Sequence, residues 1–149
     1  MPTHTMSPST HTTTPSDIVR RHYVVDAEGQ VLGRLASKVA AILKGKGKVY
    51  YSTSMDTGDF VIIVNAAKIM LTGNKLEQKT YFSHSAHWGG SHFRSMKTLM
   101  ETRPDQVVRR AVKGMLPKNR LGRKMLKKLR VYGGPEHPHQ AQKPEPLTI

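Results

Sequence analysis

Apolar and polar residues follow one another in a pattern that first predicts a strand, a helix and a second strand. Tyr23-Val24-Val25 is short and apolar, as is typical of a buried strand, and Asp26–Gly29 has the composition of a turn. From Val31 to Leu43 apolar residues recur at helical spacing, and a Gly-Lys repeat then ends the helix. The β-branched run Asp59–Asn65 favours a parallel strand buried on both faces. Together these elements predict a right-handed βαβ unit.

The second half of the chain is predicted to be mainly helical. Weaker strands are expected at residues 68–72 and 79–83, with a turn between them. Helices are expected over Ser95–Thr102 and from Pro104 to Pro117, because proline fits the first turn of a helix and also stops one. Apolar residues between Leu121 and Leu129 predict one more short amphipathic helix.

Composition divides the chain into one domain and two tails. Residues 1–20 begin with Thr, Ser and Pro and contain little to bury, so we expect a disordered or extended N-terminal tail. Residues 21–132 should form a single α/β domain with a parallel sheet and a basic helical second half. Residues 133–149 contain four prolines and should form an extended C-terminal tail.

The net charge of the chain restricts the possible binding partners more than any other property of its composition. The chain of 149 residues has 24 Lys and Arg against 10 Asp and Glu, a net charge of +14. Such an excess indicates a polyanionic partner, either nucleic acid or an acidic membrane surface. No apolar run reaches the length of a membrane helix, no secretory signal is visible, and cysteine is absent. We therefore expect a cytoplasmic protein with no disulfide and no cysteine metal site.

The strongest candidate for RNA contact is the basic segment between Asp105 and Glu136, which contains no acidic residue. Like charges four residues apart, such as Arg120 and Lys124, oppose a helix in water but suit a row of phosphates. A basic helix could instead lie on a membrane surface, but its small apolar face has no Trp or Phe. The cations of this segment are Arg109, Arg110, Lys113, Lys118, Arg120, Arg123, Lys124, Lys127, Lys128 and Arg130.

A second candidate is the predicted loop from His84 to Arg94. Its glycines permit close approach to a backbone, and the rings of His, Trp88 and Phe93 can stack on unpaired bases. Alternatively, Trp88 or Phe93 could be tucked into the core. Three imidazoles, from His84, His87 and His92, could also bind a metal ion, although no His-Glu-x-x-His motif is present.

Two further motifs point only weakly to catalysis. Asp56-Thr57-Gly58-Asp59 resembles the catalytic triplet of aspartic proteases, which need two copies, whereas this chain has one. A turn in which Asp56 bonds its own loop is the simpler interpretation. Gly45-Lys46-Gly47-Lys48 lacks the spacing of a nucleotide-binding phosphate loop.

An ordered series of short motifs resembles the bacterial large-subunit ribosomal protein L13 family. No single motif is specific for the family, but the whole series, in this order from residue 23 to the C-terminus, is highly specific for it. Thr53-Ser54-Met55 stands where the family often has a Pro-His pair, so an RNA contact by that His is not expected here. The motifs are Tyr23–Ala27, Leu32–Ala36, Asp56–Asp59, Asn65-Ala66, Thr72–Lys75, His84-x-x-His87-x-Gly89-Gly90, Ala111–Lys118, Leu129-x-Val131-Tyr132 and Glu136-His137.

The resemblance implies a three-layer αβα core with a small parallel sheet. It also implies binding to large-subunit ribosomal RNA, contact with neighbouring ribosomal proteins and an early role in subunit assembly. Magnesium is expected only as an RNA counterion, with no other cofactor, no membrane and no small-molecule substrate. We expect a non-enzymatic component of the cytoplasmic ribosome. A free-standing RNA- or DNA-binding regulator and a nuclease or His-metal hydrolase remain alternatives.

Phosphate contacts position a protein without reading sequence, so the shape of the folded RNA should provide specificity. Besides the cations of the basic segment, the predicted RNA-contacting residues are Arg34, Lys38, Lys44, Lys46, Lys48, Lys75, His84, His87, Trp88, Arg94 and His137.

Overall fold

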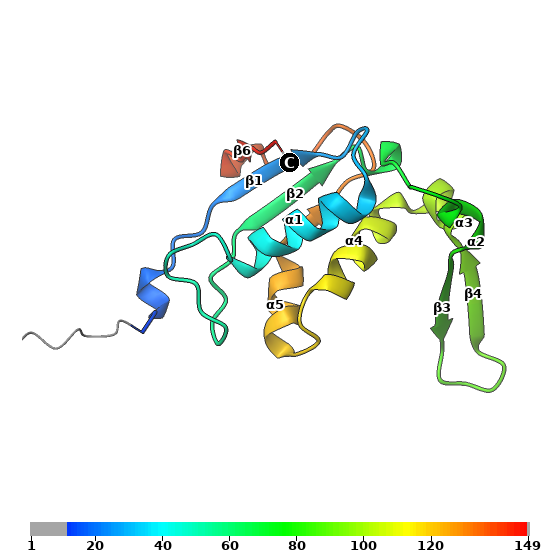
Figure 1. Cartoon of the computed structure of the whole chain (residues 1–149), viewed down its shortest axis with the longest axis horizontal. Coiled ribbons are helices and arrows are strands. Elements are labelled where there is room, and N and C mark those ends of the chain that lie inside the picture. Colours follow the sequence, from blue (N-terminus) through cyan, green and yellow to red (C-terminus); the bar gives the residue numbers. More distant parts are fainter. Residues whose placement is uncertain (1–11, 149) are drawn as a thin grey trace, which may run out of the picture.

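A four-stranded parallel β-sheet forms the centre of the protein (Figure 1). The computed structural model describes residues 12–148. The strands are β1 (His22–Asp26), β2 (Phe60–Val64), β5 (Leu129–Val131) and β6 (Glu145–Pro146), in the order β5-β2-β1-β6. β1 and β2 pair in parallel along their whole length. The predicted α/β class and the parallel βαβ unit are therefore confirmed.

Helix α1 (Leu32–Lys44) connects β1 to β2 and packs its apolar side on the sheet. Leu35, Val39 and Leu43 are fully buried, as their spacing predicts. The helix ends at Gly45, which adopts a left-handed conformation with φ of 80° that favours glycine. This turn directs the chain back toward β2.

Helices α4 (Pro104–Met115) and α5 (Arg120–Lys127) lie beside α1 over the same face of the sheet (Figure 1). α4 begins at the predicted proline, and α3 (Met96–Thr102) precedes it with Ser95 accepting a hydrogen bond from the Thr98 amide. The helical second half is therefore confirmed. The structure differs from the prediction at Leu129, which was expected to lie in the last helix but begins β5.

The opposite face of the sheet is covered by the C-terminal segment. His22 and Phe60 stack there with ring centroids 4.5 Å apart. These rings, Ile62, His139 and the end of the short 3₁₀ helix η3 (Gln140–Gln142) line one hollow. The sheet thus lies between helices on one side and this segment on the other, in agreement with the expected three layers.

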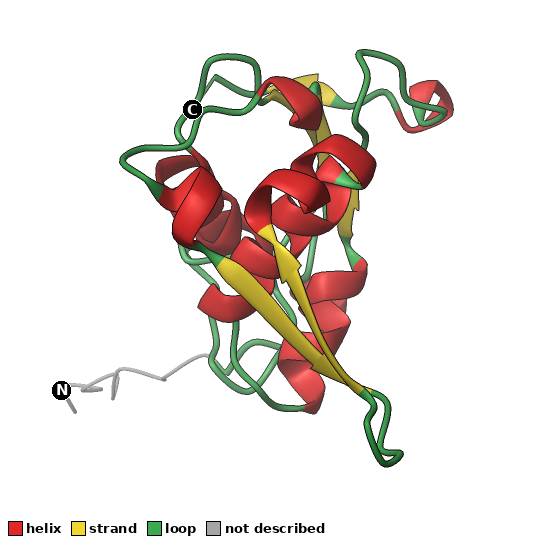
Figure 2. Cartoon of the chain, turned by 90° about the vertical axis from the view of Figure 1, so that its right-hand side faces the viewer, coloured by secondary structure: helices red, strands yellow, loops and turns green. Residues whose placement is uncertain are grey.

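A two-stranded antiparallel hairpin, β3 (Thr80–His84) and β4 (Ser91–Ser95), projects from this core (Figure 2). The prediction of a loop over residues 84–94 is therefore wrong at its two ends, because His84 belongs to β3 and Ser91–Arg94 belong to β4, while residues 85–90 form the connecting loop. The predicted strand at 68–72 is also wrong: η2 (Ala66–Lys68) and a single bridge between Val31 and Met70 stand there. The short helix α2 (Lys75–Gln78) follows.

The described parts of both predicted tails contain short elements of regular structure. Residues 1–11 and 149 of the predicted tails lie outside the described residues. In the rest of the N-terminal tail, η1 (Pro15–Asp17) forms and Thr13 donates a hydrogen bond to the Tyr50 carbonyl. The C-terminal tail contains η3 and β6, which pairs with β1. In the described part of the chain, no helix is long and apolar enough to cross a membrane.

Candidate nucleic-acid interface

The cations of α4 and α5 face away from the core. The buried side of α4 is formed by Val107, Val108 and Val112, and that of α5 by Met125, which turns the intervening basic residues outward. Arg110 is half-buried. In the described part of the chain, neither Arg110 nor any of the exposed cations of this segment forms an ion pair. Arg130 is exposed on β5, where it lines the hollow on the opposite face of the sheet, so it lies apart from the α4–α5 surface. The exposed cations of α4, α5 and the loop between them are Arg109, Lys113, Lys118, Arg120, Arg123, Lys124 and Lys127.

A cleft of about 410 Å³ separates the end of α4 from α5. Its floor is apolar, with Leu116, Pro117 and Leu126, while Arg110, Lys113, Lys118 and Arg123 line the remainder. Asn119 fixes the start of α5, because its side-chain oxygen accepts a hydrogen bond from the Gly122 amide at 2.8 Å. The predicted basic segment therefore includes a shaped concave surface with no carboxylate in its lining.

Lys128 departs from this pattern. The whole residue is only 5% exposed, and its ammonium group donates hydrogen bonds to the Asp56 carboxylate at 2.5 Å and to the Leu43 carbonyl at 3.3 Å. Burial lowers the pKa of Lys128, and the bond to Asp56 opposes that shift. The structure thus places Lys128 inside the fold. It also corrects the interpretation of Asp56, whose carboxylate binds Lys128 rather than its own loop.

The second predicted basic edge lies along α1 and the turn after it. Arg34, Lys38 and Lys46 are exposed, and Lys44 is half-buried. Lys48 is instead held internally: its ammonium donates to Asp59 at 2.5 Å and to the Val19 carbonyl at 2.7 Å. The first four side chains remain candidates for RNA contact, whereas Lys48 serves to hold the fold together.

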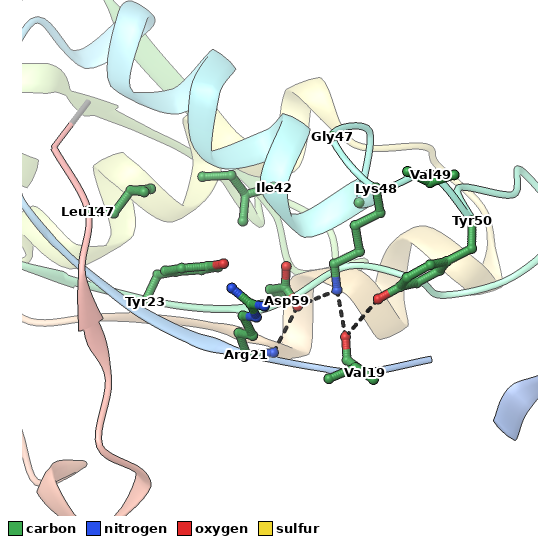
Figure 3. Close-up of a pocket in the computed structure, with 11 residues that line it drawn as sticks. Val19, Arg21, Tyr23, Ile42, Gly47, Lys48, Val49, Tyr50, Asp59 and Leu147 are labelled. Atoms are coloured by element: carbon green, nitrogen blue, oxygen red, sulfur yellow. Dashed lines mark hydrogen bonds and ion pairs between the residues drawn. The ribbon is translucent and has the colours of Figure 1, made fainter. Parts of the chain in front are cut away.

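A hollow of about 630 Å³ adjoins Lys48 (Figure 3). Tyr23, Ile42 and Leu147 form its apolar side. Arg21 and Asp59 lie across from them, and the backbone amide of Arg21 donates to the Asp59 carboxylate at 2.9 Å. The only carboxylate in the lining is thus occupied by the protein's own donors.

The hairpin carries the next group of predicted residues. His84, His87 and Arg94 are exposed, and Trp88 at the tip is 105% exposed, so the alternative of a core position for Trp88 is wrong. The imidazoles do not converge: no group of three metal-binding side chains exists among the described residues. Lys75, in α2 just before the hairpin, is exposed and lines one hollow with Arg110 of α4.

His137 lies in the C-terminal segment and is half-buried. Its ring is stacked near that of His139, with centroids 6.4 Å apart, and His139 forms a 2.8 Å hydrogen bond with the Tyr132 hydroxyl. This predicted RNA-contacting residue therefore belongs to a ring cluster of the C-terminal segment, in which His139 lines the hollow on the far face of the sheet.

Sequence patterns did not identify Phe82 as a site residue, and they left the position of Phe93 open. Both are exposed on the hairpin, at 60% and 71%. One signal was available, because the chain has no acidic residue between Glu77 and Glu101 although aromatic residues and cations are frequent there. This is the same one-sided composition that marks the basic segment.

Comparison with known proteins agrees with the ordered series of motifs. The family model described as ribosomal protein L13 matches residues 20–138. The large ribosomal subunit protein uL13 of Aquifex aeolicus is 59% identical over 91% of this chain and 94% of its own length. The corresponding protein of Chlorobium phaeobacteroides is 52% identical over 97% of both chains. The chain is therefore a member of the ribosomal protein L13 family.

Proposed function

We propose that this protein is a structural component of the large subunit of the cytoplasmic ribosome. The observation that carries the proposal is the surface of α4 and α5, where exposed cations surround a concave floor and no carboxylate neutralises them. The names of the related proteins support the same assignment. Its role is to bind and position ribosomal RNA during subunit assembly, without catalysis.

The proposed mechanism is neutralisation of phosphates where RNA segments come together. The α4–α5 cations form the main contact, and Arg34, Lys38, Lys44 and Lys46 form a second one. Lys75 of α2 and the hairpin residues His84, His87, Trp88 and Arg94 extend this surface. The hairpin and α5 project in the same direction from the sheet (Figure 1). Lys48 and Lys128 are left out because each is bound within the fold. Magnesium acts only as a counterion of the RNA.

Salt dependence tests this mechanism. If six to ten cations meet phosphates, affinity for large-subunit ribosomal RNA should fall by about 10³ to 10⁵ between 50 and 200 mM salt. Removing two contacts, with Arg123→Gln and Lys127→Gln together, should lower the slope of log affinity against log salt by about 1.4 to 1.8. Binding is measured by filter retention in magnesium buffer.

A matched control removes two exposed cations outside the proposed surface, Arg103 and Lys143. The double variant Arg103→Gln with Lys143→Gln has the same net charge as the α5 variant and should change the slope little. Equal effects of both variants would mean that only total charge matters, and would contradict a defined contact surface. Selective tight binding to a short isolated RNA, without sedimentation with large subunits, would favour a free-standing regulator.

A further inference from the structure

We propose that the outward face of the β3–β4 hairpin, formed by Phe82, His84 and Phe93, is a stacking surface for unpaired RNA bases. The inference rests on the proposed function and deepens it, because it names the part of the RNA that this face would bind. It assigns a role to two phenylalanines that lie outside the cationic surface described above.

Strand pairing places the three rings together. Phe82 pairs directly with Phe93, and His84 pairs with Ser91, so these positions share one face of the two-stranded ribbon. The Phe82 and Phe93 ring centroids are 5.2 Å apart with an interplanar angle of 50°. The His84 ring lies 6.4 Å from Phe82. The result is one contiguous aromatic surface.

The other face of the ribbon attaches the hairpin to the body. Tyr81, which neighbours Phe82 and so points the opposite way, is half-buried against the core. Its hydroxyl donates to the Met96 sulfur at 3.3 Å, and the Arg110 guanidinium lies 5.0 Å from its ring centroid. The hairpin is therefore oriented with its phenylalanines turned outward.

Exposure of this face calls for a partner. Phe82 is 60% exposed and Phe93 is 71% exposed, although burial of a phenylalanine stabilises a protein by about 1.5–3 kcal/mol. A two-stranded hairpin alone is marginally stable in water, and grouped apolar side chains at a surface mark interaction sites. Within residues 12–148, neither phenylalanine belongs to the hydrophobic core or to the side chains that pack against it. Both rings are therefore available to a molecule from outside the chain.

Charge and side-chain chemistry favour nucleic acid as that molecule. From Gln78 to Met100 there is no carboxylate, whereas Lys79, Arg94 and Lys97 are exposed cations. At the other paired positions on this face of the hairpin stand only the hydroxyl side chains of Thr80, Ser91 and Ser95. Aromatic faces combined with cations are how proteins hold single-stranded nucleotides, because each base has a flat face and each linkage a phosphate. A protein partner would be better matched by an aliphatic surface.

The test compares variants of the full chain for binding to purified large-subunit ribosomal RNA in magnesium buffer. Phe82→Leu with Phe93→Leu keeps the face apolar but removes the rings, and should raise Kd about fivefold or more. Phe82→Tyr with Phe93→Tyr keeps the rings and should stay within about twofold of the parent. His92→Leu, on the opposite face, is the matched control and should have little effect. Ultraviolet crosslinking should attach a nucleotide to Phe82 or Phe93.

The outcomes separate the inference from the proposed function. Loss of affinity in the Leu variant with an unchanged salt slope supports stacking, because phosphate contacts are then intact. If the Leu variant binds like the parent and no ring carries a nucleotide, the inference is wrong while the proposed function stands. In that case a crosslink from position 93 to a protein in the assembled subunit would identify the true occupant. If the parent chain fails to bind ribosomal RNA, both are wrong.

Discussion

The ammonium group of Lys128 lies inside the protein, although the residue belongs to the most basic part of the sequence. α5 ends one residue before it and β5 begins one residue after it, so the side chain turns inward at this junction. There it joins the Asp56 loop and the end of α1 at the Leu43 carbonyl. The ion pair compensates for the desolvation of both charges and links three elements that are distant in sequence.

Removing the ammonium should leave the Asp56 carboxylate half-buried without its partner. Lys128→Met is expected to lower the free energy of unfolding by about 3 kcal/mol, measured by urea denaturation of the isolated chain. The exposed neighbour provides the control: Lys127→Met should change stability by less than about 0.5 kcal/mol. Equal stability of the two variants would contradict a structural role for the pair.

Asp26, at the end of β1, makes a pH-dependent contribution to the stability of the fold. The Glu28 amide and the Asn65 side chain both donate to its carboxylate, at 3.0 and 2.9 Å, and these bonds lower the pKa of Asp26. A carboxylate with a lowered pKa stabilises the fold above its unfolded pKa, and this contribution is lost as the pH falls below about 4. Asp26→Asn should therefore be less stable than the parent at pH 6, and the difference in Tm should shrink at pH 2.5. A constant difference at both pH values would argue against this assignment.

At the scale of elements, the long periodic segments were predictable and the short ones were not. α1 and α4 each bury one continuous apolar stripe, which appears in the sequence as helical spacing. Leu129 fits the same spacing after Met125, yet it joins β5 because pairing with Val61 supplies contacts that no local pattern encodes. β4 has no alternating pattern, since neither of its faces is deeply buried.

The candidate site was predictable to the extent that it depends on the sign of charge. A stretch without carboxylates cannot form local ion pairs, so most of its cations had to remain on the surface. Lys48 and Lys128 were wrongly predicted to be surface cations because their carboxylate partners do not lie next to them in the sequence. Lys48 pairs with Asp59, 11 residues further on, and Lys128 pairs with Asp56, 72 residues earlier. The aromatic pair on the hairpin depended on strand register, which the polar sequence of β4 does not specify.

Close packing of α5 on the end of α4 leads to a prediction about two glycines. A Cβ at Gly122 would overlap the Pro117 carbonyl, and backbone there cannot move aside easily, so Gly122→Ala should cost about 1–3 kcal/mol. Gly114 in α4 has open space, so Gly114→Ala should stabilise the helix by about 0.5–1 kcal/mol. Both are measured by urea denaturation. Destabilisation by both substitutions would show that the close contact is not the cause.

The whole molecule carries a charge of +14 around a small core, so its stability and its RNA affinity should respond to salt in opposite directions. Like charges repel in the compact isolated chain, and salt screens them. Raising NaCl from 50 to 500 mM should increase the Tm of the isolated protein by about 3 °C or more, followed by circular dichroism, while RNA binding weakens.

A variant with four α5 cations replaced tests the origin of that response. Arg120→Gln, Arg123→Gln, Lys124→Gln and Lys127→Gln together should reduce the gain in Tm, because less repulsion remains to be screened. If the gain is the same as in the parent, the repulsion arises elsewhere on the surface.

The placement of β6 against β1 has a consequence for how the protein is made. β1 is formed by residues 22–26, but the strand that closes its free edge comes from residues 145 and 146. A growing chain therefore holds an open sheet edge until residues 145 and 146 have been synthesised. Prematurely terminated copies would keep that edge, which is the feature by which strands of separate molecules adhere to one another. Protection of this edge from self-association thus depends on a two-residue strand made more than a hundred residues after β1.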